Sequence, residues 1–171
     1  DRLRVVPLAP RRGFTLDPDP ASGAIAPAEA AQYLGLVPGR YFVYTGRYDV
    51  RQDLATLLRA LAALAADGRP PGLVEGAPWP PRILLAGANP DDRAALARAA
   101  GREGISEALA YAPAMEPERL AALVRGSRAA LLPVVSEAAG LAAVESVAVG
   151  TPVIASAVGA LPELVGVGGL L

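Results

Sequence analysis

The chain has 171 residues, of which 53% are hydrophobic and 19% are charged. This composition supplies enough apolar side chains for one compact α/β unit. The net charge of −1 argues against a nucleic-acid partner. It contains no cysteine and no histidine, which excludes disulfides, thiolate chemistry and histidine-based proton transfer and removes the commonest metal ligands. It has no apolar run of about 18 residues, the length of a membrane span, and no signal-peptide pattern. We therefore expect a cytoplasmic protein with no metal and no cofactor.

Apolar runs alternate with helical patterns along the chain, without an internal repeat. Asp53 is placed to cap a helix with a stripe of leucines, and Gly68 is placed to end it. The proline-rich stretch 72–81, which holds the single tryptophan, is expected to be a surface loop. In chain order we expect helix 27–34, strand 41–45, the helix between Asp53 and Gly68, strand 82–86, turn 87–92, helix 93–100, strand 108–111, helix 117–124, strand 129–135, helix 141–149, strand 151–155 and turn 159–164.

This alternation predicts an α/β fold, a Rossmann-like three-layer α/β/α arrangement with a parallel sheet. Ligands of such sheets bind at the carboxyl ends of the strands. Four loops follow predicted strands and are therefore expected to meet at one edge of the sheet: 45–47, 87–89, 112–116 and 137–140.

The segment 131–164 sets two carboxylates, Glu137 and Glu145, around a turn of small residues that opens a helix. These small residues let a ligand approach the backbone, and free N–H groups at a helix start attract phosphate. Glu145, inside the first turns of the helix, is placed to accept hydrogen bonds from vicinal hydroxyls such as those of ribose. The pattern indicates a sugar-nucleotide site whose backbone is contributed by Ala139, Gly140, Leu141 and Ala142.

The string Glu137, seven residues, Glu145, then GTPVIAS and VGALPELV resembles the donor-site signature of retaining glycosyltransferases of the GT-B fold, the glycosyl transferases group 1 family. The segment 41–54, YFVYTGRYDVRQDL, is similar to the strand, Gly-Arg turn and helix start that open the carboxyl-terminal domain of that family. The segment 2–7 resembles the strand that leads in from the preceding domain. The resemblance implies one half of a GT-B fold.

In this family, the place of Gly46 and Arg47 carries a guanidinium that clamps the diphosphate, and a lysine five residues further on supplies a second cation. Here that position is Gln52, a neutral amide, with Arg51 next to it as a substitute of different geometry. The resemblance further implies that Glu137 orients the hydroxyls of the donor sugar and acts as the catalytic residue, and that Glu145 holds the ribose. Met115 or its backbone is a candidate for the base pocket.

The resemblance also implies two domains in the whole enzyme, whereas this chain accounts for one. We expect 1–40 to be an interdomain strand and connection and 41–171 to be the nucleotide-sugar-binding domain, truncated at its carboxyl end. The partners implied are a nucleoside diphosphate sugar, a UDP- or GDP-hexose, and a missing amino-terminal acceptor domain. Any peripheral membrane contact would be made through the missing part.

The implied activity is hexose transfer to a hydroxyl acceptor with retention at the anomeric carbon, which this part alone would not perform. An alternative is a noncatalytic, glycosyltransferase-like binding or regulatory module, because Gln52 breaks the cationic pattern. A dinucleotide-binding oxidoreductase would need a Gly-x-Gly-x-x-Gly turn, and the stretch 45–53 offers Gly46 alone.

Overall fold

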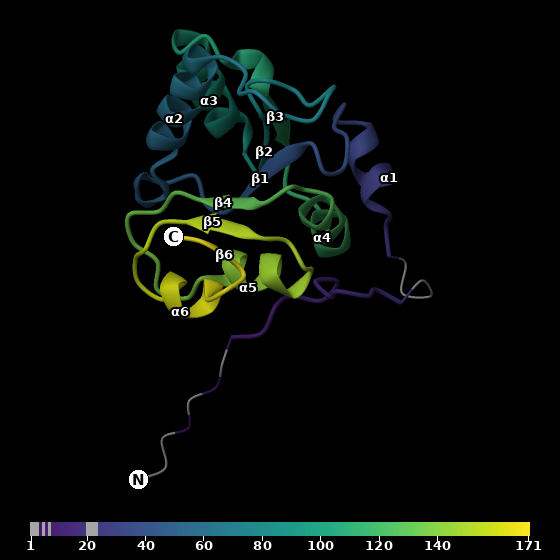
Figure 1. Ribbon diagram of the computed structural model, residues 1–171. Coiled ribbons are helices and arrows are strands. Elements are labelled where there is room, and N and C mark those ends of the chain that lie inside the picture. Colours follow the sequence, from purple (N-terminus) through teal and green to yellow (C-terminus); the bar gives the residue numbers. More distant parts are fainter. Residues whose placement is uncertain (1–3, 5, 7, 20–23) are drawn as a thin grey trace.

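The computed structural model describes residues 4, 6, 8–19 and 24–171 (Figure 1). The strand expected over 2–7 lies for the most part outside the described residues. Within them, a six-stranded parallel sheet has the order β3-β2-β1-β4-β5-β6. Its strands are β1 Tyr41–Thr45, β2 Arg82–Ala86, β3 Leu109–Ala112, β4 Ala130–Leu132, β5 Val153–Ala155 and β6 Gly169–Leu170.

The order of the strands reverses beside β1. The chain first moves outward through β2 and β3, then returns to the other side of β1 with β4 and continues outward through β5 and β6. β1 and β4 are joined through a single aligned pair, Val43 with Ala130. In open parallel sheets the crevice for a ligand forms at such a switch point, outside the carboxyl ends of the two strands.

Helices cover both faces of the sheet (Figure 1). One face carries α1 Pro27–Gln32, α4 Pro117–Arg125, α5 Leu141–Ala148 and α6 Leu161–Val165, and the other carries α2 Leu54–Asp67 and α3 Pro90–Arg102. Short 3₁₀ turns, η2 Val50–Gln52 and η3 Ser106–Ala108, precede α2 and β3. This arrangement confirms the predicted Rossmann-like α/β/α layers.

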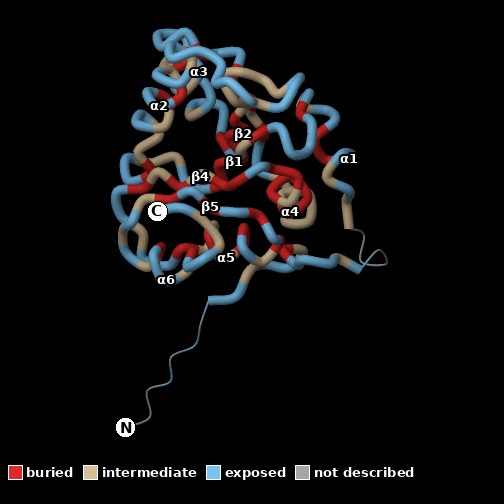
Figure 2. The backbone as a smooth tube through the Cα atoms, viewed as in Figure 1, coloured by how far each residue is buried: buried red, intermediate tan, exposed pale blue. Residues whose placement is uncertain are grey.

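Side chains of the central strands alternate between two hydrophobic cores. In β1, Val43 packs into the core under α4 and Tyr44 into the core under α2. In β2, Leu84 packs into the core under α4 and Leu85 into the core under α2. Because both faces are covered, most residues in the middle of the sheet are buried, as the tube coloured by burial shows (Figure 2).

Most of the predicted starts and stops lie within two residues of the observed ones, and four features differ more. Asp53 caps α2 as predicted, its side chain accepting from Thr56 N. The helix expected at 93–100 starts earlier, at Pro90, because Asn89 accepts from Asp92 N and proline suits the first helical position. The turn expected at 159–164 contains the short helix α6, and β6 was not predicted. The strand expected at 129–135 ends at Leu132, before Pro133, which has no N–H to donate.

Residues before β1 pack onto the same body. Phe14, Ala31 and Leu36 belong to the core under α4, and α1 contacts α4 directly. Among the described residues, no helix is both long and apolar enough to cross a membrane.

Candidate functional site

A cavity of about 680 Å³ opens at the carboxyl ends of β1 and β4, at the switch point of the sheet. Four loops that follow strands contribute to its wall, as the sequence predicts for this edge. Its volume lies in the range typical of small-molecule sites. Every residue that the sequence predicts for the site lines it: Gly46, Arg47, Arg51, Gln52, Met115, Glu137, Ala139, Gly140, Leu141, Ala142 and Glu145.

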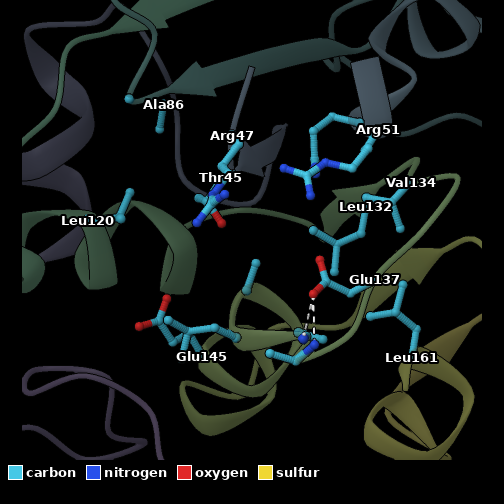
Figure 3. Close-up of a pocket in the computed structure, with 18 of the residues that line it drawn as sticks. Thr45, Arg47, Arg51, Ala86, Leu120, Leu132, Val134, Glu137, Glu145 and Leu161 are labelled. Atoms are coloured by element: carbon cyan, nitrogen blue, oxygen red, sulfur yellow. Dashed lines mark hydrogen bonds between the residues drawn. The ribbon is translucent and has the colours of Figure 1, made fainter. Parts of the chain in front are cut away.

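Glu137 turns its carboxylate back onto the start of α5. Its Oε1 accepts from the backbone N–H of Ala139 at 3.0 Å and of Gly140 at 2.9 Å, the two dashed lines of Figure 3. An acidic side chain is favoured at this end of a helix by the dipole. Of the amides expected to be free, that of Gly140 is therefore taken by Glu137 in this structure, whereas Leu141 and Ala142 lie in the first turn, where amides have no intrahelical acceptor.

The segment after β5 holds the backbone of Glu137. Ala160 N donates to the carbonyl of Glu137 at 3.3 Å. Gly159 has φ +55°, and a Cβ built on it would lie 1.8 Å from that same carbonyl oxygen. Only a residue without a side chain fits at position 159. The VGALPEL stretch therefore has a structural role, which is to hold the turn that carries Glu137.

Glu145 is almost completely buried, with 3% of its side chain exposed, on the face of α5 that borders the cavity. Both of its carboxylate oxygens are held by Arg11, which lies 134 residues earlier in the chain. The Nε of Arg11 donates to Oε1 at 2.5 Å, Nη2 donates to Oε2 at 2.9 Å, and the backbone N–H adds a longer bond of 3.3 Å. These hydrogen bonds raise the pKa of the Arg11 guanidinium above its ordinary value.

Two cations face the cavity from the loop after β1. Figure 3 shows the guanidinium groups of Arg47 and Arg51 pointing into the pocket, across from the start of α5. Arg51 is also paired with Asp49, through Nη2–Oδ2 at 2.7 Å and Nε–Oδ1 at 3.2 Å. The hydrogen bonds from Arg51 lower the pKa of Asp49, which stays a carboxylate at neutral pH.

Gln52 is buried and belongs to a small network beneath the same loop. The hydroxyl of Tyr44 lies 3.0 Å from the Oε1 of Gln52 and within hydrogen-bond distance of the carbonyl of Arg47, so its one proton is shared between two acceptors. Gly46 leaves room for this arrangement, since a Cβ there would lie 2.7 Å from the Tyr44 oxygen. Gln52 and Tyr44 thus support the turn that presents Arg47.

Two residues important to this geometry are missed by sequence reasoning. Arg11 carries no local signal, because its partner is far away in the chain. Tyr44 has the pattern of an ordinary strand residue, and its ring does pack in the core under α2. The one sequence signal for Tyr44 is its position two residues before the Gly46–Arg47 turn.

Removing the hydroxyl of Tyr44 tests this network. Tyr44→Phe is expected to lower the free energy of unfolding by about 1 to 3 kcal/mol, because it leaves buried hydrogen-bonding groups without a partner. Urea denaturation followed by circular dichroism measures this. Tyr33→Phe, a hydroxyl deletion at a side chain that is 54% exposed, should change stability by less than about 0.5 kcal/mol. Equal effects of the two changes would contradict a supporting role for the Tyr44 hydroxyl.

Acidic side chains in the described residues do not gather into a group of three or more that could hold a metal ion. The charged groups of the cavity are instead Arg47 and Arg51 on one side and Glu137 and Glu145 on the other, where Glu145 is paired with Arg11.

Comparisons with known proteins all point to one family of enzymes. The family described as glycosyl transferases group 1 matches residues 39–171. A D-inositol 3-phosphate glycosyltransferase of Rhodococcus erythropolis is 40% identical over 136 residues, which cover 75% of this chain and 28% of that protein.

Among solved structures, the sucrose-phosphate synthase of Thermosynechococcus elongatus superposes with a TM-score of 0.65 at 29% identity, over 88% of this chain and 36% of that one. HepE of Anabaena, solved in complex with UDP, superposes with a TM-score of 0.65 at 22% identity, over 85% of this chain and 38% of that one. This chain thus spans less than two fifths of the length of each of these proteins.

Proposed function

This chain belongs to the glycosyl transferases group 1 family, and from that we propose that it forms the donor-binding domain of a retaining glycosyltransferase. Its ligand is a nucleoside diphosphate sugar, a UDP- or GDP-hexose. The whole protein moves the hexose to a hydroxyl acceptor held by a second domain, in the cleft between the two. The HepE structure, a relative in fold, holds UDP, which supports the choice of ligand class.

The observation that carries this proposal is the division of charge in one cavity. Arg47 and Arg51 face the first turn of α5 across it, and Glu137 and Glu145 flank that turn. A diphosphate fits between guanidinium groups and helix amides, since both are donors that favour anions. The diphosphate joins the sugar at one end to the ribose at the other. Glu137 then accepts hydrogen bonds from the sugar hydroxyls, and Glu145 accepts them from the ribose hydroxyls.

The chemistry follows from that placement. The bond between the anomeric carbon and the phosphate oxygen breaks, and a bond from the acceptor oxygen forms on the same face of the sugar. The departing phosphate oxygen takes the proton of the acceptor hydroxyl. Arg47 and Arg51 stabilise the charge that develops on the leaving diphosphate, and Glu137 orients the sugar hydroxyls.

Gln52 favours a second candidate function. It stands where the family has a lysine, and its amide is buried against the Tyr44 hydroxyl, so it contributes no positive charge. A domain with a weakened leaving-group site would serve as a noncatalytic binding or regulatory module. Transfer of labelled hexose by the full-length protein distinguishes the enzyme from such a module.

Calorimetric titration of the chain with UDP, GDP and ADP at low salt tests the proposed function. One of these nucleotides should bind saturably, and Arg47→Ala should weaken that binding by about tenfold or more, because a hydrogen bond to a charged group contributes about 1.5 to 3 kcal/mol. Glu145→Gln, which keeps the shape of the side chain, should weaken it as well. Arg59→Ala is the control, since Arg59 lies on α2 beside Thr56 and does not line the cavity.

The proposal fails if the folded chain and its variants bind none of the three nucleotides. It also fails if the Arg59 control weakens binding as much as the change at Arg47 does, because the cation of the cavity would then have no special role.

A further inference from the structure

The ribose end of the proposed site is already occupied by a side chain of the same protein. Arg11 donates three hydrogen bonds to the carboxylate of Glu145, two to Oε1 and one to Oε2. A carboxylate offers about four lone-pair positions. One position is therefore left, whereas the vicinal hydroxyls of a ribose need two.

Arg11 is presented by a turn that is anchored on the domain. Phe14, with 2% of its surface exposed, lies in the core beneath it, and the Arg11 guanidinium sits 5.4 Å from the centre of its ring. Phe14 N donates to the carbonyl of Arg11 at 3.2 Å across Gly13, whose φ is +91°. On the far side, Arg125 Nη2 donates to the carbonyl of Thr15 at 3.0 Å. The anchored residues, Phe14 and Thr15, follow Arg11 in the chain. The side chain of Arg11 can therefore leave Glu145 while Phe14 stays in the core.

The two partners differ in how easily they are moved. The Glu145 side chain is 3% exposed, but that of Arg11 is 46% exposed, so the guanidinium returns to water easily, whereas the buried carboxylate needs a new donor when Arg11 leaves. Leu8 and Arg11 both line the cavity, which places this stretch of chain at the rim of the nucleotide site.

We propose that the turn from Arg11 to Phe14 is an autoinhibitory latch: Arg11 holds Glu145 in the empty site, and a ribonucleotide must displace it to bind. This proposal rests on the proposed function, because the competitor is the ribose of the donor. In the empty site the latch keeps a buried carboxylate paired. In the bound state the ribose hydroxyls take over as donors, and Arg11 returns to solvent above Phe14.

The test compares neighbouring arginines. Arg11→Ala should tighten binding of the preferred ribonucleoside diphosphate by about fivefold or more, since the competitor is gone. Arg12→Ala removes the same charge from the adjacent residue, which does not line the cavity, and should change binding by less than about twofold. The matching 2′,3′-dideoxynucleotide lacks the hydroxyls and should gain nothing from Arg11→Ala.

A second measurement uses the unchanged protein, in case Arg11→Ala does not fold. The backbone N–H of Arg11 donates to Glu145, so saturating nucleotide should speed its hydrogen exchange, measured by mass spectrometry on a peptide that covers residues 8–16.

The outcomes separate the two proposals. If the nucleotide binds the unchanged chain, but Arg11→Ala leaves its affinity unchanged or weaker, the latch is wrong and the donor site stands. An equal gain for the dideoxynucleotide also overturns the latch. If nucleotide binds and the exchange of the Arg11 amide slows or stays the same, the latch is again wrong. Failure of every nucleotide to bind the folded chain and the folded Arg11→Ala variant overturns both proposals.

Discussion

Replacing Gly159 by alanine is expected to destabilise the domain by more than about 4 kcal/mol, a size reached only when a substitution creates a severe structural conflict. The new Cβ would lie 1.8 Å from the carbonyl oxygen of Glu137 and 2.9 Å from its carbonyl carbon. These are backbone atoms, so no rotamer change relieves the clash. The backbone at Gly159 also has φ +55°, which a side chain makes costly in itself.

Gly35 supplies the matched control for this prediction. Its φ is +62°, close to that of Gly159, but a Cβ built there has nothing within 4 Å. Gly35→Ala should therefore cost only the strain of the left-handed backbone, about 1 to 2 kcal/mol. Urea denaturation of both variants gives the difference. If the two alanines cost the same, the close approach between Gly159 and Glu137 is not a feature of the folded protein.

A variant at Gly159 that still folds should also lose nucleotide affinity. To accommodate the new methyl group, the turn that carries Glu137 has to move, and with it the cap at the start of α5. Titration with the preferred nucleotide then reports on the site, while denaturation reports on the fold.

Leu123→Ala is the second change with a large expected effect, a loss of about 2 to 5 kcal/mol. Leu123 is 0% exposed on α4, in the core that also receives side chains from the central strands. Deleting its side chain leaves a cavity that the surrounding strands fill only in part. In addition, Tyr41 donates to the carbonyl of Leu123 at 2.5 Å, which holds the backbone in place and limits collapse around the gap.

The control for Leu123 is Leu64→Ala on α2, where the leucine is 42% exposed. The same atoms are removed, but much of their surface is already in water, so the loss should be below about 1 kcal/mol. Thermal unfolding by calorimetry measures both variants. A loss at Leu123 no larger than that at Leu64 would show that α4 is not packed as described.

Much of the fold can be predicted from local sequence. The strands at 41–45 and 82–86 are predicted without error, because each is an apolar run of strand length between clear turn signals. The edge strand β6 and the helix α6 cannot be predicted in this way. They are two and five residues long, and such short elements depend on what they pack against rather than on their own pattern.

The positions of the candidate site residues follow from the strand order, since the sequence shows which loops leave the carboxyl ends. Their partners do not follow. Arg11 and Glu145 are brought together by the path of the whole chain, and the pairing of Gln52 with Tyr44 depends on space left by Gly46. The capping bonds of Glu137 are local, whereas its contact with the donor sugar, which the family resemblance implies, stays a prediction.

The single aligned pair between β1 and β4 affects the stiffness of the domain. This pair marks the seam between two halves of the sheet, one carrying Arg47 and Arg51 and the other carrying Glu137 and Glu145. A ligand seated above the seam would touch both halves at once and act as a crosslink between them. The domain would then gain stiffness along the line where its own backbone pairing is shortest.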